Sequence, residues 1–136
     1  MVQIDLAYQG GLRCKAMHGP SRQCLITDAP VDNHGKGEYF SPTDLLATAL
    51  GSCLATVMGI IADKEGIDLA GLKVTVIKEM VSAPRRRVGK LAVQVFFPIP
   101  LNDVQKAKLE RAAHFCPAHE SLHPDIEMPI EFIYPA

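Results

Sequence analysis

Two of the four cysteines in this chain stand where a thiol could act as a nucleophile. Cys53 lies in the middle of an uncharged stretch of eighteen residues, from Leu45 to Ala62, and Cys116 directly precedes Pro117. Their separation of sixty-three positions fits neither a zinc knuckle nor a Cys-x-x-Cys redox motif. Two thiols this far apart suit a two-cysteine redox pair, provided that the fold brings them together.

Each of these thiols also has a purely structural interpretation. Apolar residues recur around Cys53 at three- and four-residue spacings, so it could be a small core side chain. A reactive Cys53 would need a nearby cation, because the middle of a helix is too far from the N-terminus for the dipole to favour a thiolate. Cys116 is expected to cap a short helical turn, where free backbone N–H groups favour a thiolate, or else to pack at a helix junction.

Three histidines lie close to Cys116 in the sequence, and together they raise the alternative of a zinc site. Cys116 and His119 have the Cys-x-x-His spacing of zinc ligands, and His123 follows four residues later. However, Pro124 ends the turn after His123, and no glutamate stands as it does in a metalloprotease helix. We therefore expect no metal and no cofactor, and we expect His114, His119 and His123 to be solvated near the entrance of a site. Cys14 and Cys24 are assigned no chemistry.

Composition favours a cytoplasmic globular protein of one domain. Charged residues make up 21% of the 136 residues and apolar residues 48%, and the net charge of -1 provides no basic footprint for nucleic acid. The first residues, from Met1 to Asp5, lack the layout of a signal peptide. The four cysteines are therefore interpreted as cytosolic thiols and not as a disulfide framework.

The uncharged stretch is interpreted as a buried helix and not as a membrane span. At 1.5 Å per residue it would be roughly 27 Å long, just enough to cross a bilayer. Yet it contains several Thr, Ser and Gly residues, and neither end carries Tyr or Trp to form an interfacial belt. Asp44 precedes the stretch, and Asp63, Lys64 and Glu65 follow it. A chain this small has little surface to wrap such a helix, so we expect a partner subunit to cover it.

The order of the predicted elements indicates an α+β fold. Ser41 and Asp44 form a predicted capping box for the long helix, Gly66 ends it, and Asn102 with Gln105 forms a second box. A loop is expected over 29–40 and a basic hairpin turn, with exposed arginines, over 82–87. The predicted strands are 3–8, 12–17, 23–27, 72–81, 88–97 and 128–134, and the predicted helices are 42–65 and 103–114, with a helical turn after 116.

Two segments carry a resemblance to a known family. The segment from Ser41 to Cys53, SPTDLLATALGSC, resembles the signature of the OsmC/Ohr family of osmotically inducible and organic hydroperoxide resistance proteins. The segment from Ala112 to Pro117, AAHFCP, resembles the family's C-terminal Cys-Pro motif. The order of elements fits the family over nearly the whole chain, so residues 1–136 are expected to form a single OsmC-like domain.

This resemblance implies both a fold and an activity. The implied fold is an antiparallel sheet packed on a long central buried helix plus a second helix, in an intertwined homodimer. The implied activity is the reduction of organic hydroperoxides, with Cys53 attacking the O–O bond and becoming a sulfenic acid that condenses with Cys116. A dithiol reductant of the dihydrolipoyl type would then reduce the disulfide. No nucleic acid or membrane takes part.

The family also uses an arginine from the N-terminal strands to hold the thiolate, and a glutamate after the helix-start proline to orient that arginine. Here Thr43 follows Pro42, and the acid is displaced to Asp44. A threonine cannot supply the orienting charge, so the arrangement around the arginine must differ. Arg13, which follows the Gly10–Gly11 turn, is the predicted active-site arginine, with Arg22 and Arg87 as alternatives.

One alternative function belongs to a different class. The protein could be a non-enzymatic dimer that binds an apolar ligand, with the cysteines incidental or redox-regulatory. In that hypothesis the long apolar helix and Met17, Met58 and Met80 would line the ligand pocket.

Overall fold

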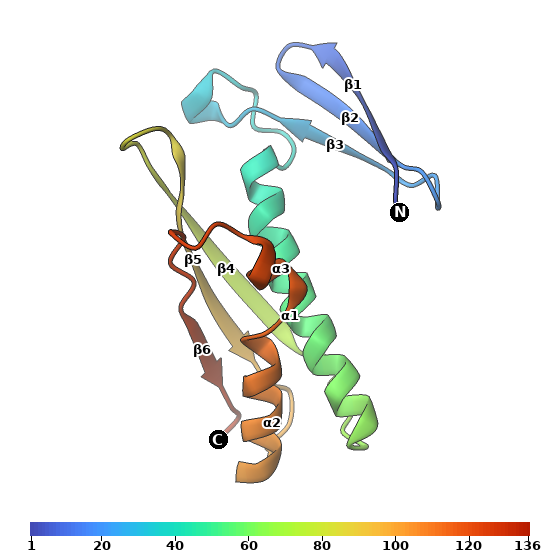
Figure 1. Cartoon of the computed structure of the whole chain (residues 1–136), viewed down its shortest axis with the longest axis vertical. Coiled ribbons are helices and arrows are strands. Elements are labelled where there is room, and N and C mark those ends of the chain that lie inside the picture. Colours follow the sequence, from blue (N-terminus) through green and yellow to red (C-terminus); the bar gives the residue numbers. More distant parts are fainter. The chain divides into compact units, whose positions relative to one another are not determined.

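A computed structural model describes all residues, 1–136, and the chain divides into two compact units. The first unit comprises Met1–Leu46 and the second Ala47–Ala136. Figure 1 labels the strands of the first unit β1 to β3, and the helices α1 to α3 and strands β4 to β6 that follow them in the chain. Because each unit has its own sheet, we describe the two separately.

The first unit is built on an antiparallel meander, as the alternating sequence predicts. Its strands are β1 (Ile4–Gly10), β2 (Arg13–His18) and β3 (Cys24–Asp28), in the order β1-β2-β3. The turn between β2 and β3 sets a register in which Arg13 lies directly opposite Asp28. The predicted loop over 29–40 contains only a short 3-10 helix, Val31–Asn33.

The long helix α1 (Pro42–Lys64) begins and ends where the capping signals predict. The backbone N–H of Ser41 donates to Asp44 Oδ2 at 2.8 Å, and the N–H of Asp44 donates to Ser41 Oγ at 3.1 Å. At the other end Gly66 adopts a φ of +70°, the left-handed conformation that stops a helix. Both predicted ends of this helix are therefore confirmed.

The second unit contains a mixed sheet of β4 (Lys73–Val81), β5 (Arg87–Phe96) and β6 (Ile130–Ile133), in that order. β4 and β5 form an antiparallel hairpin, whereas β6 runs parallel to β5. The resemblance implies an antiparallel sheet, but one pair of strands, β5 and β6, is parallel. These two strands are parallel because the chain crosses over through α2 (Asp103–Ala113) and α3 (Pro117–Ser121) before β6. The Asn102–Gln105 capping box of α2 is present.

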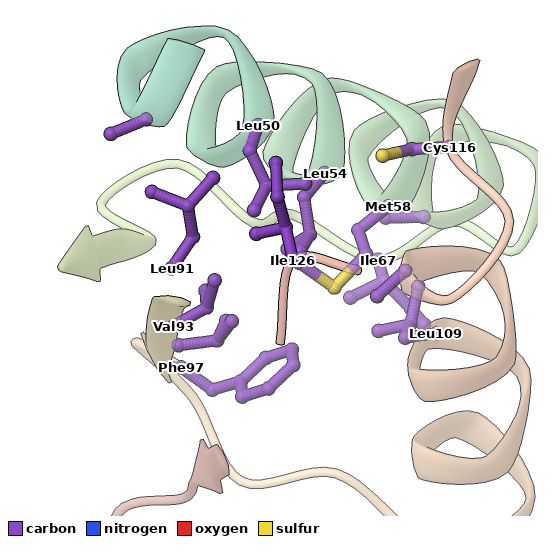
Figure 2. Close-up of a cluster of buried hydrophobic side chains, with 14 of the residues drawn as sticks. Leu50, Leu54, Met58, Ile67, Leu91, Val93, Phe97, Leu109, Cys116 and Ile126 are labelled. Atoms are coloured by element: carbon purple, nitrogen blue, oxygen red, sulfur yellow. The ribbon is translucent and has the colours of Figure 1, made fainter. Parts of the chain in front are cut away.

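The hydrophobic core of the second unit lies between α1, the sheet and α2. Leu50, Leu54 and Met58, four residues apart on one face of α1, are fully buried, and Leu109 of α2 joins them (Figure 2). Gly51 lets the helix approach the sheet, since a Cβ there would lie 3.0 Å from a methyl group of Val76.

By length and composition α1 could span a membrane, but this core packing accounts for its apolar sequence. The predicted α+β fold is confirmed.

Candidate redox site

Cys53 and Cys116 meet inside the second unit, at the beginning of α3. The backbone N–H of Ala118 donates to Cys53 Sγ at 3.5 Å, and that of His119 donates to Cys116 Sγ at 3.3 Å. The Cys53 side chain lies close enough to Cys116 to raise the pKa of that thiol. Cys116 caps α3, as its position before Pro117 predicts. The fold therefore brings together the two cysteines that the sequence analysis singled out.

The two thiols lie in different environments. Cys116 is fully buried and belongs to the apolar cluster that also contains Met58 and Leu109 (Figure 2), whereas Cys53 is half-buried. Burial raises the pKa of the Cys116 thiol, and the neighbouring Cys53 side chain raises it further, against the lowering effect of the His119 and Ala118 N–H groups. The expectation that the capping position makes Cys116 a thiolate is wrong, because the loss of hydration outweighs the two backbone donors. Cys116 is held as a neutral thiol, and Cys53 is the accessible sulfur.

Arg13 forms the centre of a second cluster, inside the first unit. Its Nε donates to Asp28 Oδ1 at 2.7 Å and its Nη2 to Asp28 Oδ2 at 2.8 Å, which makes a two-point fork. Nη2 also donates to Glu38 Oε1 at 3.2 Å, and the guanidinium carbon lies 4.8 Å from the centre of the Tyr39 ring. The guanidinium is therefore fixed on one edge and one face, and its pKa is raised by the two carboxylates.

Asp28 is a member of this cluster that the sequence analysis missed. The hydrogen bonds from Arg13 hold the pKa of Asp28 below its usual value, against the opposing effect of burial, and the backbone N–H of Glu38 lowers it further. The signal that could have found Asp28 is the hairpin register, since pairing Met17 with Cys24 also pairs Arg13 with Asp28. That register depends on the geometry of the turn at 18–23 as well as on the hydrophobic pattern of the strands.

The alternative arginines make weaker contacts. Arg22 reaches only the sulfur of Met17, at 3.9 Å, and Arg87 donates to the carbonyl oxygen of Val88 at 3.3 Å. Neither forms an ion pair with a carboxylate. Among the three candidates, Arg13 alone has a guanidinium with a fixed orientation. The neighbouring Arg85 and Arg86 are exposed in the hairpin turn, as predicted.

The histidines near Cys116 do not converge. His114 packs its ring edge against Phe132, and His123 Nδ1 accepts from the N–H of Asp125 at 3.0 Å. Nowhere in the chain do three His, Cys, Asp or Glu side chains gather in a way that could hold a metal ion. The remaining cysteines are also separate: Cys14 lies opposite Thr27 and Cys24 opposite Met17, so their side chains point to opposite faces of the sheet.

The methionines of the binding-protein hypothesis do not share a pocket. Met58 is fully buried in the core, Met80 is partly buried on β4, and Met17 belongs to the other unit. A surface hollow of about 360 Å³ lies beside the second half of α1, and it contains none of the three. Its lining consists mostly of small and polar residues: Ala55, Thr56, Gly59, Asp63, Asp68, Leu69, Ala70, Gly71 and Leu72.

Comparison with protein families gives one match to this chain. The family described as OsmC-like protein matches residues 35–131, a range that contains both cysteines of the redox site. No curated protein sequence matches the chain significantly.

Known crystal structures resemble the whole chain. A Psychrobacter arcticus 273-4 protein, described as an osmotic stress induced and detoxification response protein, is 45% identical, with a TM-score of 0.92 over 97% of this chain and 96% of that one. The organic hydroperoxide resistance protein OsmC of Legionella pneumophila is 16% identical, with a TM-score of 0.79 over 98% and 96%. An organic hydroperoxide resistance protein of Vibrio cholerae, with captopril in one active site, is 18% identical, with a TM-score of 0.74 over 96% and 90%. The last two establish similarity of fold alone.

Proposed function

Because this chain belongs to the OsmC-like protein family, we propose that it is a thiol-dependent peroxidase that reduces organic hydroperoxides in oxidative-stress defence. The observation that carries the proposal is the meeting of Cys53 and Cys116 at the start of α3, with one accessible and one buried thiol. The names of the Legionella and Vibrio proteins, which share this fold, support the same substrate class.

In the first step the thiolate of Cys53 attacks the terminal oxygen of the hydroperoxide. The S–O bond forms as the O–O bond breaks, Cys53 is oxidised to a sulfenic acid, and the alkoxide takes up a proton and leaves as an alcohol. The Ala118 N–H, 3.5 Å from Cys53 Sγ, supports negative charge on this sulfur. Arg13 is proposed to supply the cation that Cys53 needs in mid-helix, because a guanidinium stays charged even when desolvated.

In the second step the sulfur of Cys116 attacks the sulfenic sulfur of Cys53. The S–S bond forms, and hydroxide leaves with the proton of the Cys116 thiol as water. Because burial raises the pKa of Cys116, its thiol proton leaves as the S–S bond forms. A dithiol reductant, of the lipoyl type in the family resemblance, then returns both cysteines to thiols and becomes a disulfide itself.

The proposed assembly is a homodimer in the cytoplasm, with each chain acting as one OsmC-like domain. One face of α1 exposes small and apolar side chains, including Ala49, Ser52, Thr56 and Ile60, which a second copy would cover. The cytoplasm is proposed because the sequence pattern of the four cysteines is interpreted as thiols of a reducing compartment.

The test follows the thiols after rapid mixing with cumene hydroperoxide. We expect the wild type to lose thiol rapidly and a Cys53→Ser variant to lose almost none. Cys24→Ser is the matched control, because Cys24 is exposed and lies on β3 of the first unit, whereas Cys53 belongs to the second unit. Oxidation at the slow rate of a free cysteine, unchanged in Cys53→Ser, would contradict the proposal and favour the binding-protein alternative.

Peptide mapping after one equivalent of peroxide tests the second step. We expect a Cys53–Cys116 disulfide, with Cys14 and Cys24 still free, since those two side chains point to opposite faces of their sheet. A dominant linkage between Cys14 and Cys24 would mean that the redox pair is wrongly assigned.

A further inference from the structure

Asp28 is the only acidic or basic side chain that is buried, with 1% of its side chain exposed. A carboxylate removed from water is costly unless hydrogen bonds replace its hydration. Here Arg13 donates to both carboxylate oxygens, and the backbone N–H of Glu38 adds a donor to Oδ2 at 3.1 Å. Hydrogen bonds from the Arg13 guanidinium and from a backbone N–H therefore replace the water that this buried carboxylate has lost.

The fork on Asp28 determines which part of Arg13 is available. Asp28 occupies Nε and Nη2, and Nη1 makes no hydrogen bond in the structure. Because the guanidinium is planar and rigid, fixing one edge also fixes the direction of the two Nη1 N–H groups. The Arg13 side chain is 24% exposed, so the guanidinium is fixed by Asp28 but is still accessible to solvent.

From this geometry we infer that Asp28 is the positioning residue that orients Arg13 for the thiol chemistry, in place of a carboxylate after the helix-start proline. The inference rests on the proposed function, in which Arg13 assists Cys53. In this role Asp28 acts through the direction that it imposes on the guanidinium.

Two other residues are less able to orient Arg13. Thr43, which follows Pro42, is uncharged, and its hydroxyl lies 3.2 Å from Ser41 Oγ at the helix cap. Glu38 does pair with Arg13, but 60% of its side chain is exposed, and exposed ion pairs contribute little because water competes for both partners. Glu38 therefore supplies a matched comparison: both acids contact the same Nη2 atom, and they differ in burial and in the number of contacts.

A purely structural role is the competing explanation for this ion pair. β2 and β3 are already joined by their backbone ladder from Arg13–Asp28 to Met17–Cys24, which does not need the side chains. Buried ion pairs often add little net stability, since desolvation offsets their attraction. The test must therefore measure the reactivity of Cys53 and not only the stability of the fold.

The experiment compares Asp28→Asn with Glu38→Gln in the full-length protein. The rate of Cys53 alkylation by iodoacetamide is followed by peptide mass spectrometry from pH 5 to 9, beside the rate of thiol loss with cumene hydroperoxide. We expect Asp28→Asn to slow alkylation at pH 7 about tenfold and to move the midpoint of its pH profile upward by about one unit. Glu38→Gln should slow it by no more than about threefold.

A double-variant cycle separates orientation of Arg13 from any other effect. In an Arg13→Ala background, Asp28→Asn should cause no further loss of Cys53 reactivity, because the residue through which it acts is gone. Asp28→Glu keeps the charge but displaces it, and it should recover part of the rate. Should Asp28→Asn fail to fold by circular dichroism, Asp28→Glu carries the test, and a wild-type profile in that variant would overturn the inference.

The inference and the proposed function can fail separately. If the wild type consumes hydroperoxide through Cys53 while Asp28→Asn leaves the alkylation profile unchanged, the inference about Asp28 is wrong and the function stands. If Asp28→Asn shifts the alkylation profile while the wild type does not reduce hydroperoxides, the positioning role is supported and the proposed reaction is wrong. Loss of reactivity that is equal in the Arg13 and Arg13→Ala backgrounds would also overturn the inference.

Discussion

The two units of this protein are organised around different interactions. In the first unit only four side chains are buried, namely Ala16, Thr27, Asp28 and Ser41. The buried carboxylate of Asp28 accepts two hydrogen bonds from the Arg13 guanidinium. In the second unit a continuous apolar cluster spans α1, the sheet and α2, and Cys116 belongs to it. Substitutions in the first unit should therefore change reactivity more than folding, whereas substitutions in the second should change folding first.

The difference also separates the two kinds of group that the proposed reaction needs. The thiols lie at the edge of an apolar core, where burial keeps Cys116 protonated. The guanidinium lies on a sheet whose side chains are mostly exposed, where the buried Asp28 and the exposed Glu38 hold it by ion pairs. Charge and hydrophobic burial are thus provided by different parts of the chain.

The largest effect is expected from placing a charge in the apolar core. Leu50 is fully buried, so Leu50→Asp would bury an unpaired carboxylate at a cost of several kcal/mol, a large part of the roughly 5–15 kcal/mol that stabilises a typical domain. We expect this variant to lose its helical circular dichroism signal.

Ile60→Asp on the same helix is the matched control, because 51% of Ile60 is exposed. This variant should stay folded but show weaker self-association in sedimentation. A folded Leu50→Asp protein with an unchanged melting temperature would contradict the distinction between the two units. A stable, folded wild-type monomer at low concentration would contradict the proposed dimer.

A smaller but still large effect is expected from removing the charge at the centre of the first unit. Arg13→Ala should lower the rate of Cys53 with cumene hydroperoxide on the order of 10²-fold, the loss typical of a missing charge-stabilising donor. Arg13→Lys should recover only part of the rate, since an ammonium lacks the planar fork that matches Asp28.

Arg22→Ala is the control for this prediction, because Arg22 contacts only a methionine sulfur and forms no ion pair. Its reaction with hydroperoxide should match that of the wild type. Unchanged Cys53 alkylation in Arg13→Ala, between pH 5 and 9, would exclude Arg13 from the mechanism and turn attention to Arg22 or Arg87.

The third prediction concerns the pH dependence of the buried thiol. Because burial raises the pKa of Cys116, its thiolate forms only above the usual range for cysteine, about 8.5. At pH 8 iodoacetamide should therefore alkylate Cys116 on the order of tenfold more slowly than the exposed Cys24. Peptide mapping over time measures both rates in one sample.

In urea-unfolded protein the two cysteines should react alike, because unfolding removes the burial. The same raised pKa means that Cys116 stabilises the folded state at neutral pH, and that this contribution falls as the pH rises above the unfolded value. Equal alkylation of Cys116 and Cys24 in the folded protein would show that the core around Cys116 is open to solvent.

The smallest effect is expected from the acid titration of Asp28. Its pKa is lower in the folded state than the usual value of about 3.9, so its carboxylate stabilises the fold above that pH. This stabilisation is lost as the pH falls through the folded value. Urea unfolding at pH 7, 4 and 3 should therefore show a steeper loss for the wild type than for Asp28→Asn. Parallel losses would mean that the ion pair does not contribute to the acid sensitivity.

Much of the fold could be predicted from local patterns. The capping pairs Ser41–Asp44 and Asn102–Gln105 and the stop at Gly66 are short-range signals, and the structure confirms all three. The strand boundaries also fall within two or three residues of the predicted ones, because alternation along a strand is a property of consecutive residues. The parallel pairing of β6 with β5 depends on a crossover of more than thirty residues, and no local pattern encodes it.

For the candidate site, the sequence by itself identified Cys53, Cys116 and Arg13 from residue type, position and resemblance. It could not reveal that Asp28 holds Arg13, since that contact depends on the register of a hairpin. Nor could it assign the protonation of Cys116, for which the capping position and burial predict opposite shifts. Only the tertiary structure decided between them, because Cys116 is buried in an apolar cluster with side chains far away in the sequence, such as Leu54 and Met58. The desolvation that this cluster causes is larger than the effect of the two backbone N–H groups.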